Sequence, residues 1–427
     1  MRRRSFMLAC VLLALLAVAM AGCGRSRATP TPEPVTVTFA YRQGIAEYEP
    51  LANEFRRLHP EIEIQLRPIN QARGGLNSVD WNEVDVIRWG QDFLTPQRME
   101  QILPLDEILR GDINFPFDDM VDHAMEGLRV QGIQWGIPAG VDFAVAYYDA
   151  MRFKIAHATP PTADWTLDEF LIAASSVHNT EKTSAAVEFT YGFCSEPEAG
   201  DPIYFTYLFG GRLFDRIPDA TRPTLNEPEN IEAIQWYTDL NKVYGVMPTP
   251  EELRKAFPRG RRFEAIVRSK CGLWLGQYSD RGGKAWGFEW QGEGVMLPLP
   301  RVRTPFTALW VDGYYIMATS PHRREAWEWV RFLLEYEAAA GQMMPPRRSQ
   351  VHSSAYATRV GEEIAAIARD LPPNAVLIPA NPDPILEQVT ERYIEAVTQV
   401  LAEDVSVESA LDAAQIDAEA LFASGEP

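Results

Sequence analysis

The sequence predicts an α/β protein that folds as two lobes. Residues 35–66 read as strand, helix and strand in succession, and this unit is the building block of a parallel sheet. About 390 residues follow the N-terminal signal and spacer, more than one hydrophobic core normally organises. Two lobes of ordinary size, each built from strands and helices, are therefore expected.

Hydrophobic periodicity defines the first strand–helix–strand unit. Residues 35–40 alternate with period two among β-forming side chains, which indicates a strand. Apolar residues from Tyr48 to Leu58 recur at helical spacing until Pro60 ends the helix, and residues 62–66 form the returning strand. Because ligands bind beyond the carboxyl ends of parallel strands, the residues directly after the first strand lie at the mouth of a crevice.

The rest of the chain continues the alternation of strands and helices. Residues 85–89 and 145–149 are predicted strands, and Thr166 with Glu169 forms a capping box for a helix over 165–175. The remaining predicted elements are a helix that Asn226 caps ahead of Ile231, an apolar strand over 307–317, a helix over 321–340 that Ser320 caps, and helices after Pro346.

The N-terminus reads as a lipoprotein export signal. Three arginines precede an apolar run from Phe6 to Ala21 that is too short for a comfortable membrane span. Small residues before Cys23 suit a lipoprotein signal peptidase, although Met20 stands where the usual pattern has leucine. We expect residues 1–22 to be removed, Cys23 to be diacylated, and residues 23–34, rich in Thr and Pro, to form a tether.

Two alternatives to this lipoprotein signal are a secretory signal cut after Ala21 and an uncleaved anchor. All three interpretations place the folded chain outside the cytoplasm. Under the lipoprotein interpretation, the lipid on Cys23 anchors the folded chain to the cell membrane.

The folded chain is strongly acidic. Its formal net charge is −19, and removal of the signal leaves 37 basic residues against 59 acidic ones, a charge of −22. Such a field repels phosphate backbones and anionic headgroups. The charge therefore argues against nucleic-acid binding and electrostatic docking to a membrane, and solubility is the simpler explanation for it.

Cysteine and histidine usage gives no support to catalysis or metal binding. Of four cysteines, Cys10 leaves with the signal and Cys23 carries the lipid, so Cys194 and Cys271 remain in the folded body, either as a disulfide or as two buried thiols. The six histidines form no pair at metal-ligand spacing. The chain also lacks GxSxG, GxxxxGK[ST] and strand-linked GxGxxG motifs, so no catalytic residue, metal or cofactor is predicted.

The order of several short motifs resembles the extracellular solute-binding proteins of ATP-driven importers, in particular the sugar-binding family that includes maltose-binding proteins. The motifs that carry the resemblance are Phe55 to Ile62, Asp85-Val86 with Leu103 to Asp106, Trp135 to Pro138, Tyr147 to Asp149, Tyr207 to Gly211, Gly272 to Trp274, Leu297 to Pro300, and Asp312 to Ile316 followed by Ser320 and Glu325 to Trp327. Together they cover nearly the whole mature chain.

The resemblance implies a type II periplasmic-binding-protein fold, in which each lobe is a mainly parallel sheet flanked by helices. Lobe 1 is expected to comprise residues 35–148 and 301–344, and lobe 2 residues 149–300 and 345–427. The expected function is capture of a mono- or oligosaccharide between the lobes and delivery to an ABC permease. We expect a monomer that carries no cofactor.

A sugar receptor needs flat aromatic surfaces for the CH faces of the ring and fixed polar groups for its hydroxyls. The aromatic candidates at predicted strand ends or loops are Tyr41, Trp89, Trp135, Tyr204, Tyr207, Trp274, Tyr278, Trp310 and Tyr314, and the polar candidates are Asp92, Asp142, Asp312 and Arg347. Trp274 and Trp310 are preferred by their place in the motif order. Core packing is the competing role for each aromatic residue, and a surface or hinge role for each charge.

Two other functions fit the same composition. Paired carboxylates in an aromatic cleft can cleave a sugar, so a secreted glycosidase is one alternative, although no local motif singles out an acid and a base. A ligand-sensing subunit that docks on a signalling receptor is the other, because it would share the fold. Polyols and glycerol phosphodiesters are further candidate ligands.

Overall fold

The computed structural model describes residues 34–70, 73–179, 189–216, 220–286, 288–303, 306–371, 376–377 and 384–424. The predicted signal peptide and Cys23 lie outside these residues. Within the described ranges, every helix is too short or too polar to cross a bilayer.

The first half of the molecule begins with the predicted strand–helix–strand unit. Strand β1 (Val35–Arg42) pairs in parallel with β2 (Ile62–Ile69) on one side and with β3 (Val86–Gly90) on the other. Helices α2 (Glu49–Leu58) and α11 (Arg323–Leu334) pack on one face of these strands through Phe39, Phe55 and Trp329, all fully buried. Aromatic edge-to-face contacts, with ring centroids 5.1 Å apart for Phe55 and Trp329, fix the two helices against each other.

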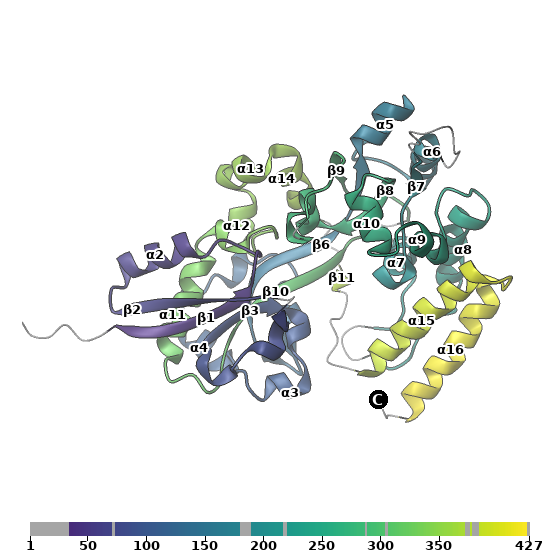
Figure 1. Cartoon of the computed structure of the whole chain (residues 1–427). Helices are drawn as coiled ribbons and strands as arrows, with labels where there is room; N and C mark the ends of the chain where they lie inside the picture. The colour runs from purple at the N-terminus through teal and green to yellow at the C-terminus, as the bar shows by residue number, and fades with distance from the viewer. Residues whose placement is uncertain are drawn as a thin grey trace, which may run out of the picture.

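Two long strands connect this half to the second (Figure 1). Strand β10 (Ala308–Ile316) lies between β3 and β6 (Ile137–Asp149) and is antiparallel to both. The later residues of β6 leave β10 and pair instead with β8 (Cys271–Gln277) and β9 (Gly294–Leu297) in the second half. One sheet, in the order β2-β1-β3-β10-β6-β8-β7, therefore runs through both halves, and we call β6 and β10 the crossing strands.

A third connection accompanies the crossing strands. Met344 and Val141 exchange two backbone hydrogen bonds of 2.9 Å, which hold the segment after α11 beside β6. Helices α12 (Arg348–Val351), α13 (Ser354–Val360) and α14 (Glu362–Arg369) follow this segment, and their buried side chains pack with those of β6 and β8. The lobe boundaries predicted from the sequence stay predictions.

In the second half, helices cover both faces of the sheet. The predicted capping box is confirmed at α6 (Leu167–Val177), where the Thr166 and Glu169 side chains each bond the other's backbone N–H. Four short elements precede β6 in the chain: α3 (Pro96–Met99), α4 (Asp106–Gly111), β4 (Arg129–Val130) and β5 (Ile133–Gln134). The remaining helices and strands follow β6: α5 (Ala150–Ala156), β7 (Tyr191–Phe193), α7 (Asp201–Leu208), α8 (Pro228–Lys242), α9 (Pro250–Ala256), α10 (Arg261–Val267), β11 (Val376–Leu377), α15 (Pro384–Ala402) and α16 (Val407–Ser424).

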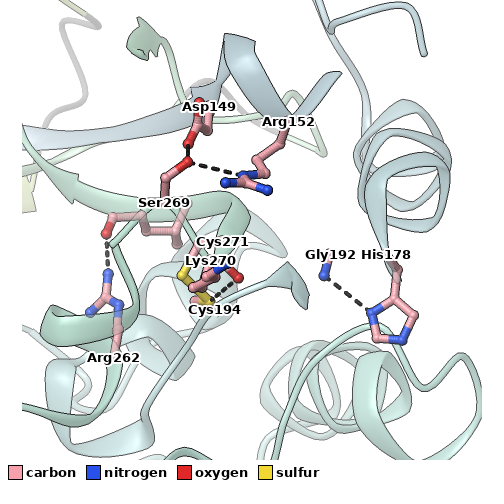
Figure 2. The surroundings of a disulfide bond; sticks show 10 residues. Asp149, Arg152, His178, Gly192, Cys194, Arg262, Ser269, Lys270 and Cys271 are labelled. Atoms are coloured by element: carbon pink, nitrogen blue, oxygen red, sulfur yellow. Dashed lines mark hydrogen bonds between the residues drawn. A yellow bond between two sulfur atoms is a disulfide. The ribbon is translucent and has the colours of Figure 1, made fainter. Parts of the chain in front are cut away.

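Cys194 and Cys271 form a disulfide, with Cα atoms 5.5 Å apart. It joins the end of β7 to the start of β8, two parallel neighbours, and both cysteines are fully buried. Figure 2 shows a polar cluster close by, in which Arg152 Nε donates to Ser269 Oγ at 3.0 Å and Ser269 Oγ donates to Asp149 at the end of β6. Strands β7 and β8 are thus linked by a covalent bond as well as by backbone hydrogen bonds.

Three sequence predictions differ from the structure. Asn226 does not cap α8, because its side chain donates to Asp412 at 2.8 Å and Glu227 takes the N-cap position. Helix α11 starts after Ser320, whose hydroxyl donates to the Asp85 carboxylate at 2.5 Å, and it ends at Leu334 instead of residue 340. Parallel pairing holds for β1, β2 and β3 and for β7 with β8, whereas the crossing strands are antiparallel.

Candidate binding site on the crossing strands

The strand register gathers five of the polar and aromatic side chains on one face of the sheet. Residues that pair directly across strands point to the same face. Tyr41 pairs with Arg88, Asp312 with both Gly90 and Gly140, and Trp310 with Asp142. We call Tyr41, Arg88, Asp142, Trp310 and Asp312 the crossing-strand face.

Arg88 fixes the first-half side of this face. Its guanidinium is buried and contacts Asp312 Oδ2 at 3.3 Å. It also donates to Tyr48 Oη at 2.7 Å and to the carbonyl oxygens of Ala339 and Ala340 at 2.6 and 2.9 Å. Because a buried charge is tolerated only with a partner and filled hydrogen bonds, this network holds the Asp312 carboxylate in one place.

Asp142 occupies the matching place on the second-half side, without a cation. Its carboxylate accepts hydrogen bonds from the backbone N–H of Ser279 at 3.0 Å and from Ser279 Oγ at 2.5 Å. Burial raises the pKa of Asp142 to about 7, and repulsion from Asp280 and Asp312 adds to the increase, while the Ser279 bonds oppose it. Asp142 is therefore protonated in part at neutral pH.

Asp92 extends the row of carboxylates into the first half. It follows β3, its side chain is exposed, and its pKa is raised by the burial of its surroundings and by the negative charge of Asp312. A hydrogen bond from Trp89 and the charge of Arg42 act in the opposite direction. The charge of Asp312 thus acts on both Asp92 and Asp142, and that of Asp280 acts on Asp142; we call these four acids the acidic row.

Trp310 and Tyr204 supply the aromatic part of the site. Trp310 is partly exposed, and Tyr204 on α7 meets it edge to face with ring centroids 6.0 Å apart. Burial raises the pKa of the Tyr204 hydroxyl, with further contributions from Asp201, Asp280 and Asp142. Because Trp310 also pairs directly with Asp142, an aromatic surface and a carboxylate lie side by side here.

A scan against family models decides the class of protein. Residues 99–368, more than half of the chain, match the model described as bacterial extracellular solute-binding protein. The chain belongs to this family. Its members are binding proteins found outside the cytoplasm, which agrees with the disulfide, since disulfides persist in oxidising compartments.

Solved structures of solute-binding proteins have the same fold. The chain is similar to an ABC substrate-binding protein from Listeria monocytogenes in complex with cycloalternan, at 17% identity and TM-score 0.72, covering 92% of this chain and 100% of that one. It is similar to the cyclic α-maltosyl-1,6-maltose binding protein from Arthrobacter globiformis, at 19% identity and TM-score 0.69, with coverage of 92% and 100%. A solute-binding protein from Thermotoga lettingae bound to α-D-tagatose gives 19% identity and TM-score 0.66, with coverage of 91% and 100%. These likenesses confirm the predicted two-lobe periplasmic-binding-protein fold.

The solute-binding fold places the other predicted residues away from the crossing-strand face or inside packed cores. Trp89 and Trp135 pack in the cluster on the opposite face of the first half, although Trp89 bonds to Asp92. Four further aromatic candidates are buried, and each contacts another aromatic side chain. Tyr207 stacks on Phe306, and Trp274 stacks on Tyr147. The hydroxyl of Tyr278 bonds to that of Tyr356, and Tyr314 packs beside Phe39. Arg347 is partly buried and pairs with Asp119 and Glu335, each at 2.7 Å.

Sequence reasoning missed three polar residues of this candidate site: Arg88, Ser279 and Asp280. Arg88 had a usable signal, because it interrupts an otherwise apolar strand between Ile87 and Trp89. Ser279 and Asp280 lie in the turn after β8, where Asp280 accepts from the backbone N–H of Gln277 at 2.7 Å. Such turn residues look like ordinary surface residues in the sequence.

A separate cavity of about 590 Å³ lies in the second half, between β6, β9 and α14. Its lining is mainly apolar and includes Phe143, Tyr148, Leu297 and Ile367. No residue predicted to bind ligand lines it. The cavity is therefore separate from the candidate site on the crossing-strand face.

Proposed function

We propose that this solute-binding protein captures a neutral carbohydrate at the crossing-strand face and delivers it to an ABC permease. The observation that carries the proposal is the meeting of the acidic row with the Trp310 and Tyr204 rings. Carboxylates accept hydrogen bonds from sugar hydroxyls, and an indole ring packs against the CH face of a sugar. Two structural relatives, one in complex with cycloalternan and one bound to α-D-tagatose, support this ligand class, as does a third that is described as a cyclic α-maltosyl-1,6-maltose binding protein.

The crossing-strand face is nearly covered in this structure, so ligand entry requires the two halves to separate. Tyr41, Asp142 and Asp312 are each less than one-tenth exposed. Arg281 of the second half also donates to the Gln342 carbonyl at 2.8 Å, beside the third connection. Binding would then shift the balance between open and closed forms, and the permease would recognise the closed form.

The test is isothermal titration calorimetry with maltose, mannobiose, mannotriose, tagatose and ribitol, together with glucuronic acid as an anionic sugar. At least one neutral compound should bind, and glucuronic acid should not, because the acidic row repels it. Trp310→Ala should weaken binding by tenfold or more, while Trp327→Ala, on α11 in the first half, leaves affinity unchanged. Equal affinity in wild type and Trp310→Ala would remove Trp310 from the site, and release of reducing ends would indicate a glycosidase.

We also propose that the chain is a monomer held at the membrane by a lipid on Cys23. The small residues before Cys23 and the tether after it support this attachment. In cells, Cys23→Ser should move the protein from the membrane fraction to the soluble fraction. Retention of that variant in the membrane fraction would favour an uncleaved anchor.

A further inference from the structure

Within the described residues, one group of three side chains has the donor types and spacing of a metal site. The ligand atoms of His59, Glu61 and Glu328 all lie within 4.8 Å of one another. His59 Nδ1 is 3.6 Å from Glu61 Oε1 and 3.9 Å from Glu328 Oε2. The group lies on the first half at α2 and α11, apart from the crossing-strand face.

The ring of His59 is held in position. His59 is the C-cap residue of α2, and its backbone N–H donates to the Phe55 carbonyl at 2.8 Å. Its imidazole stacks on the Phe55 ring with centroids 4.5 Å apart and an interplanar angle of 23°. Stacking on a fully buried phenylalanine fixes the ring plane, so that Nδ1 faces the two carboxylates.

The two carboxylates approach from elements that are fixed relative to His59. Glu61 follows Pro60, which restricts the chain between the two donors, and the backbone N–H of Ile62 donates to the His59 carbonyl at 3.0 Å. Glu328 lies on α11, which packs against α2 through the buried Phe55 and Trp329 rings. Arg324 Nε bonds the Oε1 atom of Glu328 at 3.1 Å and leaves Oε2 directed at His59.

The spacing fits a small divalent ion after a minor adjustment. Zinc bonds to imidazole nitrogen and carboxylate oxygen of about 2.0–2.1 Å place tetrahedral donor atoms about 3.3 Å apart. The separations of 3.6 and 3.9 Å from His59 exceed this value by about 0.3 and 0.6 Å, and all donor atoms of the group lie within 4.8 Å of one another. The exposed Glu61 side chain can rotate to shorten these distances. We propose that His59, Glu61 and Glu328 bind Zn²⁺, with water as the fourth ligand, and so link α2 to α11.

The experiment is calorimetric titration of ZnCl₂ into chelator-treated, tag-free mature protein, with CaCl₂ and MgCl₂ in parallel. We expect one equivalent of Zn²⁺ to bind and the hard oxygen-seeking ions to give no heat. Zn²⁺ should also raise the melting temperature, because it binds only the folded chain. Wild-type protein that binds no stoichiometric Zn²⁺ would overturn the proposal.

Matched variants separate this site from unspecific binding. His59→Gln and Glu61→Gln should each lower Zn²⁺ affinity at least tenfold, and Glu61, being exposed, can be changed without loss of folding. His123→Gln is the control, because His123 Nδ1 lies 2.8 Å from a single carboxylate, that of Glu126. Equal affinity in His59→Gln, Glu61→Gln and His123→Gln would show that Zn²⁺ binds elsewhere. Sugar affinity should be unchanged in all three variants.

Discussion

Two carboxylates occupy comparable places on the crossing strands, Asp312 on β10 and Asp142 on β6, but their surroundings differ. Asp312 faces the buried guanidinium of Arg88, which balances its charge. Asp142 accepts hydrogen bonds from neutral groups, the backbone N–H of Phe143 and the N–H and hydroxyl of Ser279, and it lies near the acids Asp280 and Asp312. On the first-half side of the site the carboxylate charge is therefore neutralised by a fixed cation, whereas the carboxylate on the second-half side changes its protonation near pH 7.

The two halves also stabilise their strands by different means. In the first half, Arg88 on β3 joins β10 to the segment after α11 through an ion pair with Asp312 and hydrogen bonds to the Ala339 and Ala340 carbonyls. In the second half, the disulfide between Cys194 and Cys271 links β7 to β8. One sheet is thus held by buried polar contacts at one end and by a covalent bond at the other.

The largest expected effect comes from removal of the Arg88 charge. Arg88→Met should lower the free energy of unfolding by about 3–5 kcal/mol, because it leaves the Asp312 carboxylate and two backbone carbonyls without their partner. Urea denaturation followed by circular dichroism measures the loss. Arg347→Met is the control, since its partly exposed ion pairs should contribute about 1 kcal/mol or less. Similar losses in both variants would show that Arg88 contributes no more than a partly exposed ion pair and would contradict its role in holding Asp312.

A smaller effect is expected from removal of the disulfide. The bond closes a loop between residues 77 apart in sequence, and Cys194→Ala combined with Cys271→Ala should lower the free energy of unfolding by about 2–4 kcal/mol. Denaturation with and without reductant measures this effect, and the double variant should not respond to reductant. A wild-type protein whose midpoint is unchanged after full reduction would contradict the prediction.

The pH dependence of Asp142 should sharpen the contrast with Asp312. Its pKa of about 7 in the folded chain exceeds the value of about 3.9 in the unfolded chain, so the folded state binds more protons between these values. Asp142 therefore adds stability below about pH 4, and this stability is lost as pH rises through 7. The free energy of unfolding of Asp142→Asn, relative to that of wild type, should therefore rise by about 2 kcal/mol between pH 5 and pH 8.

Urea midpoints of both proteins at pH 5 and pH 8 check this expectation. Asp312→Asn is the matched comparison, because it removes a partner from the buried Arg88 and should destabilise the protein at both pH values. A difference between Asp142→Asn and wild type that is constant with pH would refute the assignment of a raised pKa to Asp142.

Features with a local cause could be predicted from the sequence. The strand–helix–strand unit at the start of the folded chain follows from periodicity, and the capping box of Thr166 and Glu169 depends on residues three apart. The placing of Trp310 at a ligand site came from motif order and stays a prediction; the structure shows that Trp310 pairs with Asp142 across the crossing strands. These features depend on few and nearby residues.

Features that depend on distant partners could not be predicted. Arg88 bonds to carbonyls about 250 residues away, and Asp142 bonds to Ser279, 137 residues away. Trp274 and Trp310 look alike in the sequence, yet Trp274 stacks on Tyr147 in a core. Because one residue of register moves a side chain to the other face of a sheet, strand pairing had to be known to distinguish them.

The continuous sheet limits how the molecule can move. Strands β6 and β10 are bonded to each other from Leu309 to Tyr314, and each extends into the opposite half. Sliding one half past the other would break this ladder, whereas a hinge rotation needs only small torsional changes along two ribbons. The crossing strands therefore favour rotation of one half relative to the other about a hinge and oppose sliding of the two halves.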